Sequence, residues 1–527
     1  MGIKLSRAWA KRMENLARQA EKGYTATISQ LMSLSSDADQ ALTDGSLQTP
    51  QWILLKFNCS SLLINLGSDR GNREAVLHGY ECAEAAMMKA GDSEMKPSLE
   101  YNIANGLSAL NAIDRQAWRT AEPACPTGLL ELKDRARLRR LRALYASVGS
   151  SAASADLRGR ALCNLGNSLD HSGRWLEAYQ AYVDALKADP TNGNAAGNAA
   201  ELLRRRAALG RGLAGHYAAV YDHYRELAQR YRSRTVEVAG EAVARRWDAL
   251  LPSGSLGHHS HDGDPLDEYQ QWIKNHRLAL AGAVEGLGSD EPRWDSALAE
   301  AVTVAPGEPD PPLIFTSMNV LKAEYLVARR LAFEGESRLR KSLFSQDPAD
   351  TGTYADTLDM AIYGEPAAQL VLAQRATLDL LDKVAVAANE HFKTGVNPGG
   401  VKFPDYWRKR ESDVTREGIP LQPEQPSAAV ALAELAFDMD PEGLYPEAKT
   451  LRNAGTHRLV HVTQGDATGV TKLAHSSIDS ETLIQATHQS LRVARSAFIY
   501  LIDLIHDQED LLDEEGVRLP LPLPTQQ

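Results

Sequence analysis

The chain has 527 residues, of which 43% are hydrophobic, 24% charged and 6% aromatic, and its formal net charge is −12. This composition indicates a soluble helical protein of several domains, and the acidic excess excludes non-specific coating of nucleic acid, which depends on Lys and Arg. The four cysteines form no C-x-x-C pair, which disfavours a zinc module, and no apolar run approaches the roughly 18 residues that cross a bilayer. We therefore expect a cytoplasmic protein with reduced thiols, no cofactor and no membrane contact.

Helical repeats are predicted for the N-terminal half. Apolar residues recur there at helical spacing, and the clearest repeat occupies residues 159–190. Gly166 and Ala178 are small enough to let two antiparallel helices approach, and Pro190 ends the second helix. The stretch resembles a tetratricopeptide repeat, a helix-turn-helix unit of about 34 residues. We predict a tetratricopeptide-like α-solenoid over residues 1–250.

Asparagines recur at one position of these repeats. Asn164 is followed one period later by Asn198, and Asn102 occupies the equivalent place in an earlier helix. In tetratricopeptide arrays this position faces the concave groove, so the resemblance implies an asparagine ladder that binds the backbone of an extended peptide. Asn105 and Asn167, one turn later in their helices, add to the ladder. Helix caps or ordinary surface asparagines explain the same pattern, so a protein or peptide partner is one of two interpretations.

Two basic runs, residues 133–142 and 204–206, are interpreted as solvated helix faces balanced by acidic neighbours rather than as nucleic-acid patches. The array ends at residues 251–265, a segment rich in Gly, Ser and Pro that we predict to be the linker between domains. This linker contains His258, His259, His261, Asp262 and Asp264. These side chains could hold a divalent metal, but ligands crowded on a Gly-flanked linker favour a flexible polar loop.

Beyond the linker, four segments have the apolar spacing of helices: residues 266–280, 315–334, 378–392 and 490–505. Helices connected in series in this way form a bundle. We predict that this domain covers residues 266–515 and that residues 516–527 form a flexible Pro-rich tail.

Two groups of charged residues in this half have more than one interpretation. Lys322, Glu324 and Lys383 could support a site, although surface ion pairs are the simpler explanation. The basic run at residues 408–410 follows Tyr406 and Trp407 and could hold RNA by charge and stacking.

The residues with the clearest catalytic chemistry lie at positions 451–462, which read L-R-N-A-G-T-H-R-L-V-H-V. The apolar spacing predicts a helix on which Asn453, His457 and His461 form one polar stripe, with Arg452 at its flank. An imidazole that exchanges protons near neutral pH, an amide that orients it and a permanent cation suit phosphodiester cleavage without a metal. A solvated helix face has the same spacing.

The R-N-x-x-x-H motif, set among ordered helical landmarks, resembles the HEPN superfamily and in particular a bacterial subgroup often fused to tetratricopeptide repeats. Many HEPN domains are metal-independent endoribonucleases. The resemblance implies that Arg452 and His457 are catalytic, that Asn453 supports them, and that two subunits pair so that their motifs share one cleft. The predicted fold is therefore all-α, with a tetratricopeptide-like helical repeat array followed by a HEPN four-helix-type bundle.

Two functions agree with these patterns. The first is a toxin-like endoribonuclease, assigned to antiphage defence by family analogy and controlled by a protein or peptide on the repeat groove. In this enzyme His457 is the general acid/base and Arg452 binds the phosphate. Asn453 orients either His457 or the phosphate. Attack by the ribose 2′-hydroxyl restricts this enzyme to RNA and leaves a 2′,3′-cyclic phosphate. The second is a non-catalytic scaffold whose HEPN bundle binds RNA or protein and dimerises.

Overall fold

A computed structural model gives the fold of the chain. It describes residues 4–22, 26–125, 129, 132–209, 213–254, 266–285, 295–299, 301–304, 312–342, 347–355, 361–407, 418–422, 427–446, 459–465, 475–512 and 517–520. The chain divides into two compact units. The first comprises Met1–His171, Gln180–Asn198 and Ala228–Asp248, and the second comprises Ser172–Tyr179, Ala199–Leu227 and Ala249–Gln527.

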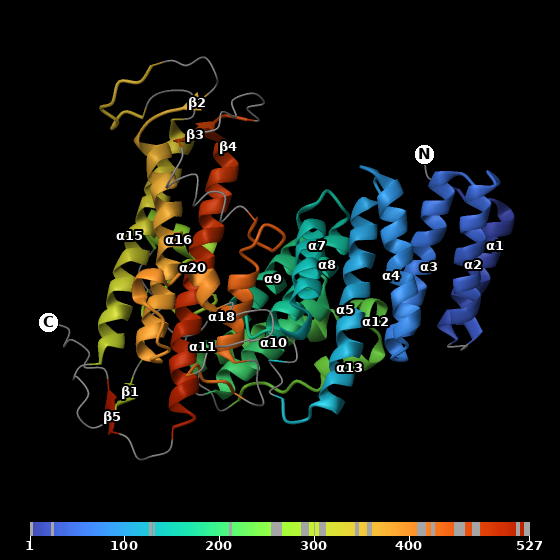
Figure 1. Ribbon diagram of the computed structural model, residues 1–527, viewed down its shortest axis with the longest axis horizontal. Coiled ribbons are helices and arrows are strands. Elements are labelled where there is room, and N and C mark those ends of the chain that lie inside the picture. The colour runs from blue at the N-terminus through green and yellow to red at the C-terminus, as the bar shows by residue number, and fades with distance from the viewer. Residues whose placement is uncertain are drawn as a thin grey trace. The chain divides into compact units, whose positions relative to one another are not determined.

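The first unit is a series of helices, each packed against its neighbours in sequence (Figure 1). In chain order it contains α1 (Arg7–Glu21), α2 (Ala26–Thr43), α3 (Thr49–Asp69), α4 (Arg73–Ala90), α5 (Lys96–Ala121), η1 (Leu132–Asp134), α7 (Arg135–Ser150), α8 (Ala155–His171), α12 (Arg232–Ala239) and α13 (Glu241–Asp248). The division between units falls within α9 (Trp175–Ala188), α10 (Gly193–Ala208) and α11 (Ala214–Arg230), so each unit contains part of these helices. Packing between sequence neighbours is the arrangement expected of a helical repeat array.

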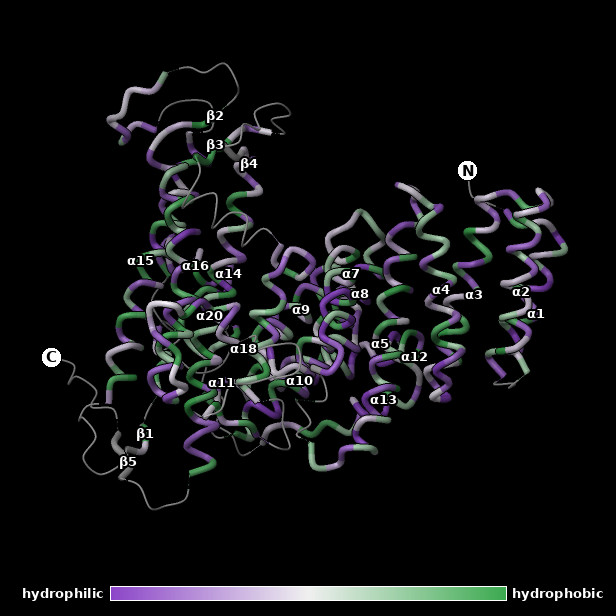
Figure 2. Tube along the Cα trace, in the orientation of Figure 1, coloured by the Kyte–Doolittle hydropathy of each residue, from purple (hydrophilic) through white to green (hydrophobic). Residues whose placement is uncertain are grey.

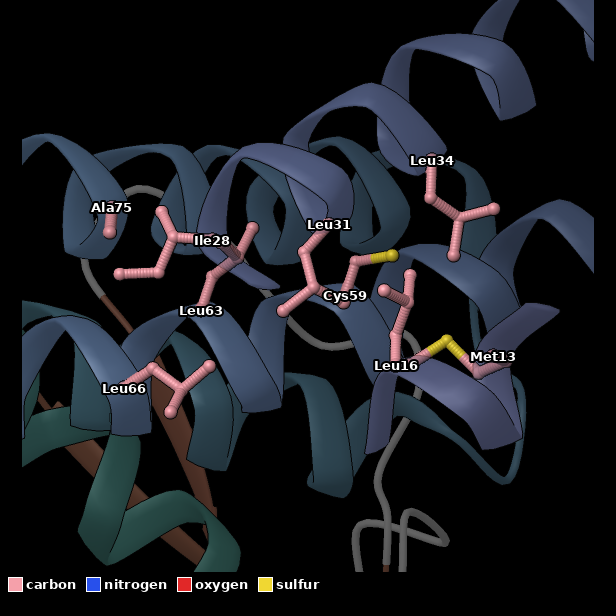
Figure 3. Close-up of a cluster of buried hydrophobic side chains, with 9 residues drawn as sticks. All are labelled: Met13, Leu16, Ile28, Leu31, Leu34, Cys59, Leu63, Leu66 and Ala75. Atoms are coloured by element: carbon pink, nitrogen blue, oxygen red, sulfur yellow. The ribbon is translucent and has the colours of Figure 1, made fainter. Parts of the chain in front are cut away.

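Buried apolar side chains at helical spacing hold the first four helices together. Figure 3 shows one such cluster, which comprises Met13, Leu16, Ile28, Leu31, Leu34, Cys59, Leu63, Leu66 and Ala75. Leu31, Leu34 and Leu63 are fully buried. Burial of a leucine side chain contributes about 1.5–3 kcal/mol, so this cluster favours the stacked arrangement over isolated helices.

The predicted close approach of two helices in the clearest repeat is present. A Cβ atom added to Gly166 of α8 would lie 2.4 Å from a ring carbon of Tyr182 in α9. The Tyr182 hydroxyl donates to the side-chain oxygen of Asn167 at 3.0 Å. Glycine is therefore required at position 166 because the tyrosine ring occupies the space of a side chain.

The second unit is built on three long helices that pack against one another: α15 (Leu313–Lys341), α16 (Glu365–His391) and α20 (Ser480–Glu509). Its shorter helices are α14 (Glu268–His276), η2 (Pro398–Gly400), α17 (Phe403–Trp407) and α18 (Ala428–Phe437). Figure 2 shows hydrophobic and hydrophilic stretches alternating along the long helices, as expected when one face of each is buried. The prediction of an α-helical fold, with repeat-like helices first and a helical bundle last, is confirmed.

Among the described residues of the second unit, five short strands accompany the bundle, and the predicted all-α fold did not include them. β2 (Ala361–Ile362), β3 (Leu459–Thr463) and β4 (His475–Asp479) form one sheet, in which β3 is antiparallel to β2 and parallel to β4. β1 (Ala301–Val304) and β5 (Val517–Pro520) form an antiparallel pair. The two sheets lie at opposite ends of the bundle (Figure 1). The positions of β5 were assigned above to a Pro-rich tail, and pairing with β1 gives them a defined structure.

The basic runs are more buried than predicted. In the first unit, Arg142 is fully buried and Arg137 bonds to Asp114 at 2.9 Å. In the second unit, Arg206 bonds to Asp503 and lies 4.2 Å from the centre of the Trp175 ring. The interpretation of both runs as solvated faces was therefore wrong in part, because several of these arginines pair with acidic residues inside their unit.

None of the described helices combines the length and the apolar character that a membrane span requires.

Candidate functional site

Arg452, Asn453 and His457, the predicted catalytic residues, lie outside the described residues. So does the histidine-rich linker segment at 255–265. The structure does describe the chain just after the motif, where β3 begins at Leu459. β3 is therefore the described element that follows the motif most closely in the sequence.

β3 is held at one end of the long helices. Val462, the fourth of its five residues, is buried in a cluster with Leu339 of α15, Leu370 of α16 and Leu483 of α20. Leu459, at the strand's start, is exposed. The last residues of the strand are thus anchored in the core, while its first residue, two positions after His457, faces solvent.

The predicted helix through residues 451–462 is wrong for its last four positions, which belong to β3. Val460 and Val462 are β-branched and favour extended backbone, and strands on both sides satisfy the backbone hydrogen bonds of β3. Because His461 lies in this strand, the proposed polar stripe on one helix face does not extend to it.

Asp479 connects the β3 end to the start of α20. Its carboxylate accepts backbone hydrogen bonds from Glu481 and Thr482 at 3.0 and 3.1 Å, which caps the helix. It also accepts from the backbone N–H of Gly465 at 2.9 Å, just after β3. Burial acts to raise the pKa of Asp479, but these backbone hydrogen bonds outweigh it and lower the pKa.

Three aromatic rings, one of them on β3, form a row that no sequence pattern predicted. Tyr354 and Tyr363 are stacked with ring centres 6.5 Å apart, and Tyr363 meets the His461 ring edge-on at 6.4 Å. Tyr354 is 45% exposed and Tyr363 is 39% exposed, so both can meet a ligand. We call these three residues the aromatic row; no motif joins them in the sequence, because β3 pairing brings them together.

The described charged side chains at this end of the bundle largely neutralise one another. Arg338 bonds to Asp347 at 2.9 Å and to Glu365 at 3.0 Å. The hydrogen bond from Arg338 is the main reason that the pKa of Asp347 is lowered. Arg340 bonds to Glu481 at 3.3 Å.

Lys383, a predicted candidate for support of the site, forms an exposed ion pair with Glu324 at 2.5 Å. Lys322 is partly buried, and burial lowers its pKa. The simpler interpretation of these residues as surface ion pairs agrees with the pairing of Lys383 and Glu324.

Tyr406 and Trp407 do not form the predicted stacking surface for RNA. Both are almost completely buried, at 2% and 3% exposure, and their rings pack edge-on 4.9 Å apart. The basic residues 408–410 lie outside the described residues. The stacking part of that prediction was wrong because α17 places these rings in the core.

A hydrogen-bonded cluster joins Glu336 of α15 to two other helices. One oxygen of its carboxylate accepts from the indole nitrogen of Trp272 at 3.0 Å and lies 2.7 Å from Nε2 of His488. The other accepts from Arg340 at 3.0 Å. The His276 ring lies 4.1 Å from the His488 ring, centre to centre. Burial acts to raise the pKa of Glu336, but His488, Arg340 and Trp272 lower it to about 2.

The repeat array contains a groove of about 430 Å³ within the first unit. Asn105, Asn164 and Asn167 line it, together with Arg115 and Arg160. None of the described residues that line it is acidic. A groove with amide donors and cationic side chains suits a segment that offers carbonyl and carboxylate oxygens.

The predicted asparagine ladder consists of hydrogen-bonded pairs. Asn164 donates to Asn105 at 3.2 Å, and Asn198 donates to Asn167 at 2.8 Å. Asn102, by contrast, is buried and donates to the backbone oxygen of Phe57 at 3.3 Å. Of the three residues first proposed, Asn164 lines the groove, Asn198 donates a hydrogen bond to the lining residue Asn167, and Asn102 connects two helices.

In the sequence, the segment that carries the R-N-x-x-x-H motif follows helices α15 and α16 and precedes strand β3 and helix α20. Residues 306–508 match the family of LA2681-like HEPN domains. This HEPN-like domain includes α15, α16 and all of α20 except its last residue, and it spans the positions of Arg452, Asn453 and His457. The match supports the HEPN part of the resemblance drawn from the sequence. No curated protein matches the chain.

Proposed function

We propose that this protein is a metal-independent endoribonuclease that cleaves RNA at its HEPN-like domain. The observation that carries the proposal is that the matched segment contains an arginine, an asparagine and a histidine in the order R-N-x-x-x-H. Packing alone does not call for these three side chains together. The HEPN-like domain supports an RNA-directed role in general, and the motif supports cleavage in particular.

The chemistry assigns one task to each residue. His457 takes the proton of the ribose 2′-hydroxyl or donates one to the departing 5′-oxygen. Arg452 stabilises the charge that develops on the phosphoryl oxygens. Asn453 orients the imidazole or the phosphate. The products carry a 2′,3′-cyclic phosphate, and DNA, which lacks the attacking hydroxyl, is not cut.

A homodimer is part of the proposal. One histidine cannot easily serve as base at one end of the reaction and as acid at the other, whereas two motifs facing one cleft provide both groups. The exposed start of β3, two residues after His457, supports a site that a second subunit can reach.

The aromatic row supplies a surface for the bases next to the scissile phosphate. Stacking on an aromatic ring stabilises a bound base by about 1–3 kcal/mol and tolerates any sequence. Tyr354 and Tyr363 are the two exposed rings, and His461 joins the row from the strand that follows the motif. Replacement of Tyr363 by alanine is therefore expected to raise KM for RNA more than it lowers kcat.

The repeat groove is the proposed control point of a toxin-like enzyme, with antiphage defence as its role by family analogy. The asparagine amides would bind the backbone of an extended segment, and Arg115 with Arg160 would favour an acidic side chain or a C-terminal carboxylate on it. Engagement of this groove would switch nuclease activity on or off.

The test is cleavage of labelled RNA by the full chain in EDTA, alongside the His457→Ala and Arg452→Ala variants. We expect cyclic-phosphate products from the wild type and a loss of about 10²–10⁴-fold in rate for His457→Ala. Equal rates for wild type and His457→Ala contradict the proposal. RNA binding without cleavage by a folded wild type, with and without groove ligand, favours the second candidate, a non-catalytic HEPN scaffold for RNA or protein.

A further inference from the structure

The histidine–glutamate cluster, defined as His276, Glu336 and His488, lies where three helices of the second unit meet. His276 is the last residue of α14, Glu336 lies in α15 and His488 lies in α20. One ligand atom from each residue lies within 4.8 Å of the other two. Glu336 and His488 are buried, and His276 is partly exposed. The cluster thus combines side chains that are far apart in sequence and close in space.

Two imidazoles and one carboxylate are a common ligand set for zinc and related ions. With metal–ligand bonds of about 2.0–2.1 Å, the ligand atoms of a tetrahedral ion lie about 3.4 Å apart. His488 Nε2 and the Glu336 carboxylate oxygen are 2.7 Å apart, so they need to move apart only slightly to reach the spacing of two ligands of one ion. We propose that this cluster binds a divalent transition-metal ion, with zinc as the expected occupant.

The surroundings of the carboxylate fit this assignment. Trp272 and Arg340 each donate a hydrogen bond to Glu336 and so fix the orientation of its oxygens. At known metal sites, residues that hydrogen-bond to the ligands orient them in the same way. Imidazole nitrogens and a carboxylate oxygen are donor atoms that zinc binds, and the ion would place a positive charge beside the Glu336 carboxylate.

The ion would link α14 to the bundle. This helix has nine residues, and its described polar contacts to α15 include the bond from Trp272 to Glu336. Coordination by His276 would add a bond from its C-terminal end to α15 and α20 at once. The expected effect is a more stable second unit. The ion takes no part in the chemistry of the proposed RNA cleavage, and its binding is measured without RNA, so failure of one proposal can be told from failure of the other.

The experiment titrates Co²⁺ and Zn²⁺ into the chelator-treated full chain. Co²⁺ reports its coordination through visible absorption, Zn²⁺ is followed by competition, and melting curves are recorded with and without metal. Glu336→Gln keeps the shape and the donors around the carboxylate but removes the anionic ligand, and His276→Ala removes the exposed ligand. His223→Ala, an exposed histidine elsewhere in the second unit, is the matched control. A second control replaces the three linker histidines, His258, His259 and His261, by alanine.

We expect one tightly bound ion per wild-type chain and a higher melting temperature with metal. Affinity should fall by more than about tenfold in Glu336→Gln and in His276→Ala, while both controls behave like wild type. The absence of stoichiometric binding to the wild type overturns the proposal. So does binding that survives both cluster substitutions or disappears only in the linker variant. Melting curves in the absence of metal verify that each variant is folded.

Discussion

Arg174 donates a hydrogen bond to Asp438, although the two residues are 264 positions apart and both are completely buried. Both belong to the second unit. The same guanidinium bonds to Glu177 at 2.9 Å and to the Tyr445 hydroxyl at 3.0 Å. Burial acts to lower the pKa of Arg174, but Glu177, Tyr445 and Asp438 together raise it, so the side chain stays charged. A residue of the predicted repeat region is thus part of the core around α18.

This pair predicts a large loss of stability on removal of one partner. In Asp438→Ala the buried Arg174 guanidinium loses one of its anionic partners. We expect the free energy of unfolding to fall by about 3–5 kcal/mol. Denaturant unfolding followed by circular dichroism measures the change. Arg204→Ala breaks an exposed pair with Glu201 and should cost less than about 1 kcal/mol. Similar costs for the two variants would show that the buried pair is not important for stability.

Substitution of Gly166 tests the helix contact in the repeat. In Gly166→Ala the new methyl group collides with the Tyr182 ring, and we expect a loss of about 1–3 kcal/mol from the forced shift. Gly400→Ala is the control, because a Cβ at position 400 meets nothing within 4 Å. Thermal unfolding measures the melting temperature of both variants and of the wild type. An unchanged melting temperature for Gly166→Ala would mean that α8 and α9 are farther apart than described.

The cap of α20 predicts a pH dependence. Asp479 has a lower pKa in the folded chain than its ordinary pKa of 3.8. Its charge therefore stabilises the fold fully above pH 3.8, and this stabilisation is lost as the pH falls through the pKa of the folded state. Asp479→Ala should cost about 1 kcal/mol at pH 7 and progressively less as the pH falls below 3.8. Urea unfolding of the wild type and of Asp479→Ala at several pH values gives the cost at pH 7 and at acid pH. A cost that is the same at pH 7 and at acid pH would contradict the role of the carboxylate charge.

The cysteines predict a simple pattern of thiol labelling. Burial raises the pKa of Cys59 and Cys163 to about 12 and also raises that of Cys82, so these thiols are rarely ionised and poorly reached at pH 8. Cys125 is only partly buried. A thiol reagent should therefore modify Cys125 first and the other three only on unfolding. Cys125→Ser removes the fast phase, and a fast phase that persists in this variant would contradict the described burial.

The asparagine groove predicts a loss of partner affinity. Asn164→Ala removes an amide from the groove lining and from its pair with Asn105. Binding of extended acidic peptides, selected from a peptide library on the wild type, should weaken by about 1 kcal/mol or fivefold. Asn15→Ala, an exposed asparagine in α1, should bind as the wild type does. Equal affinity in all three proteins would place the peptide elsewhere.

Several features could be predicted from the sequence because they depend on local spacing. The apolar periodicity of residues 315–334, 378–392 and 490–505 predicted helices that the structure contains as parts of α15, α16 and α20. The small Gly166 indicated a close helix contact for the same reason. The strand at Leu459–Thr463 was missed because a five-residue segment with three apolar residues fits both a helix and a strand, and pairing with distant strands decides between them.

The sequence by itself determined the helical character of the chain, the recurrence of asparagines and the presence of an arginine and a histidine in one short motif. The tertiary structure alone decided which residues meet. It brings Tyr354 and Tyr363 beside His461, joins His276 with Glu336 and His488, and buries Tyr406 and Trp407. The physical reason is that helical period and propensity act within about ten residues, whereas contacts between helices and strands depend on the packing of the whole unit.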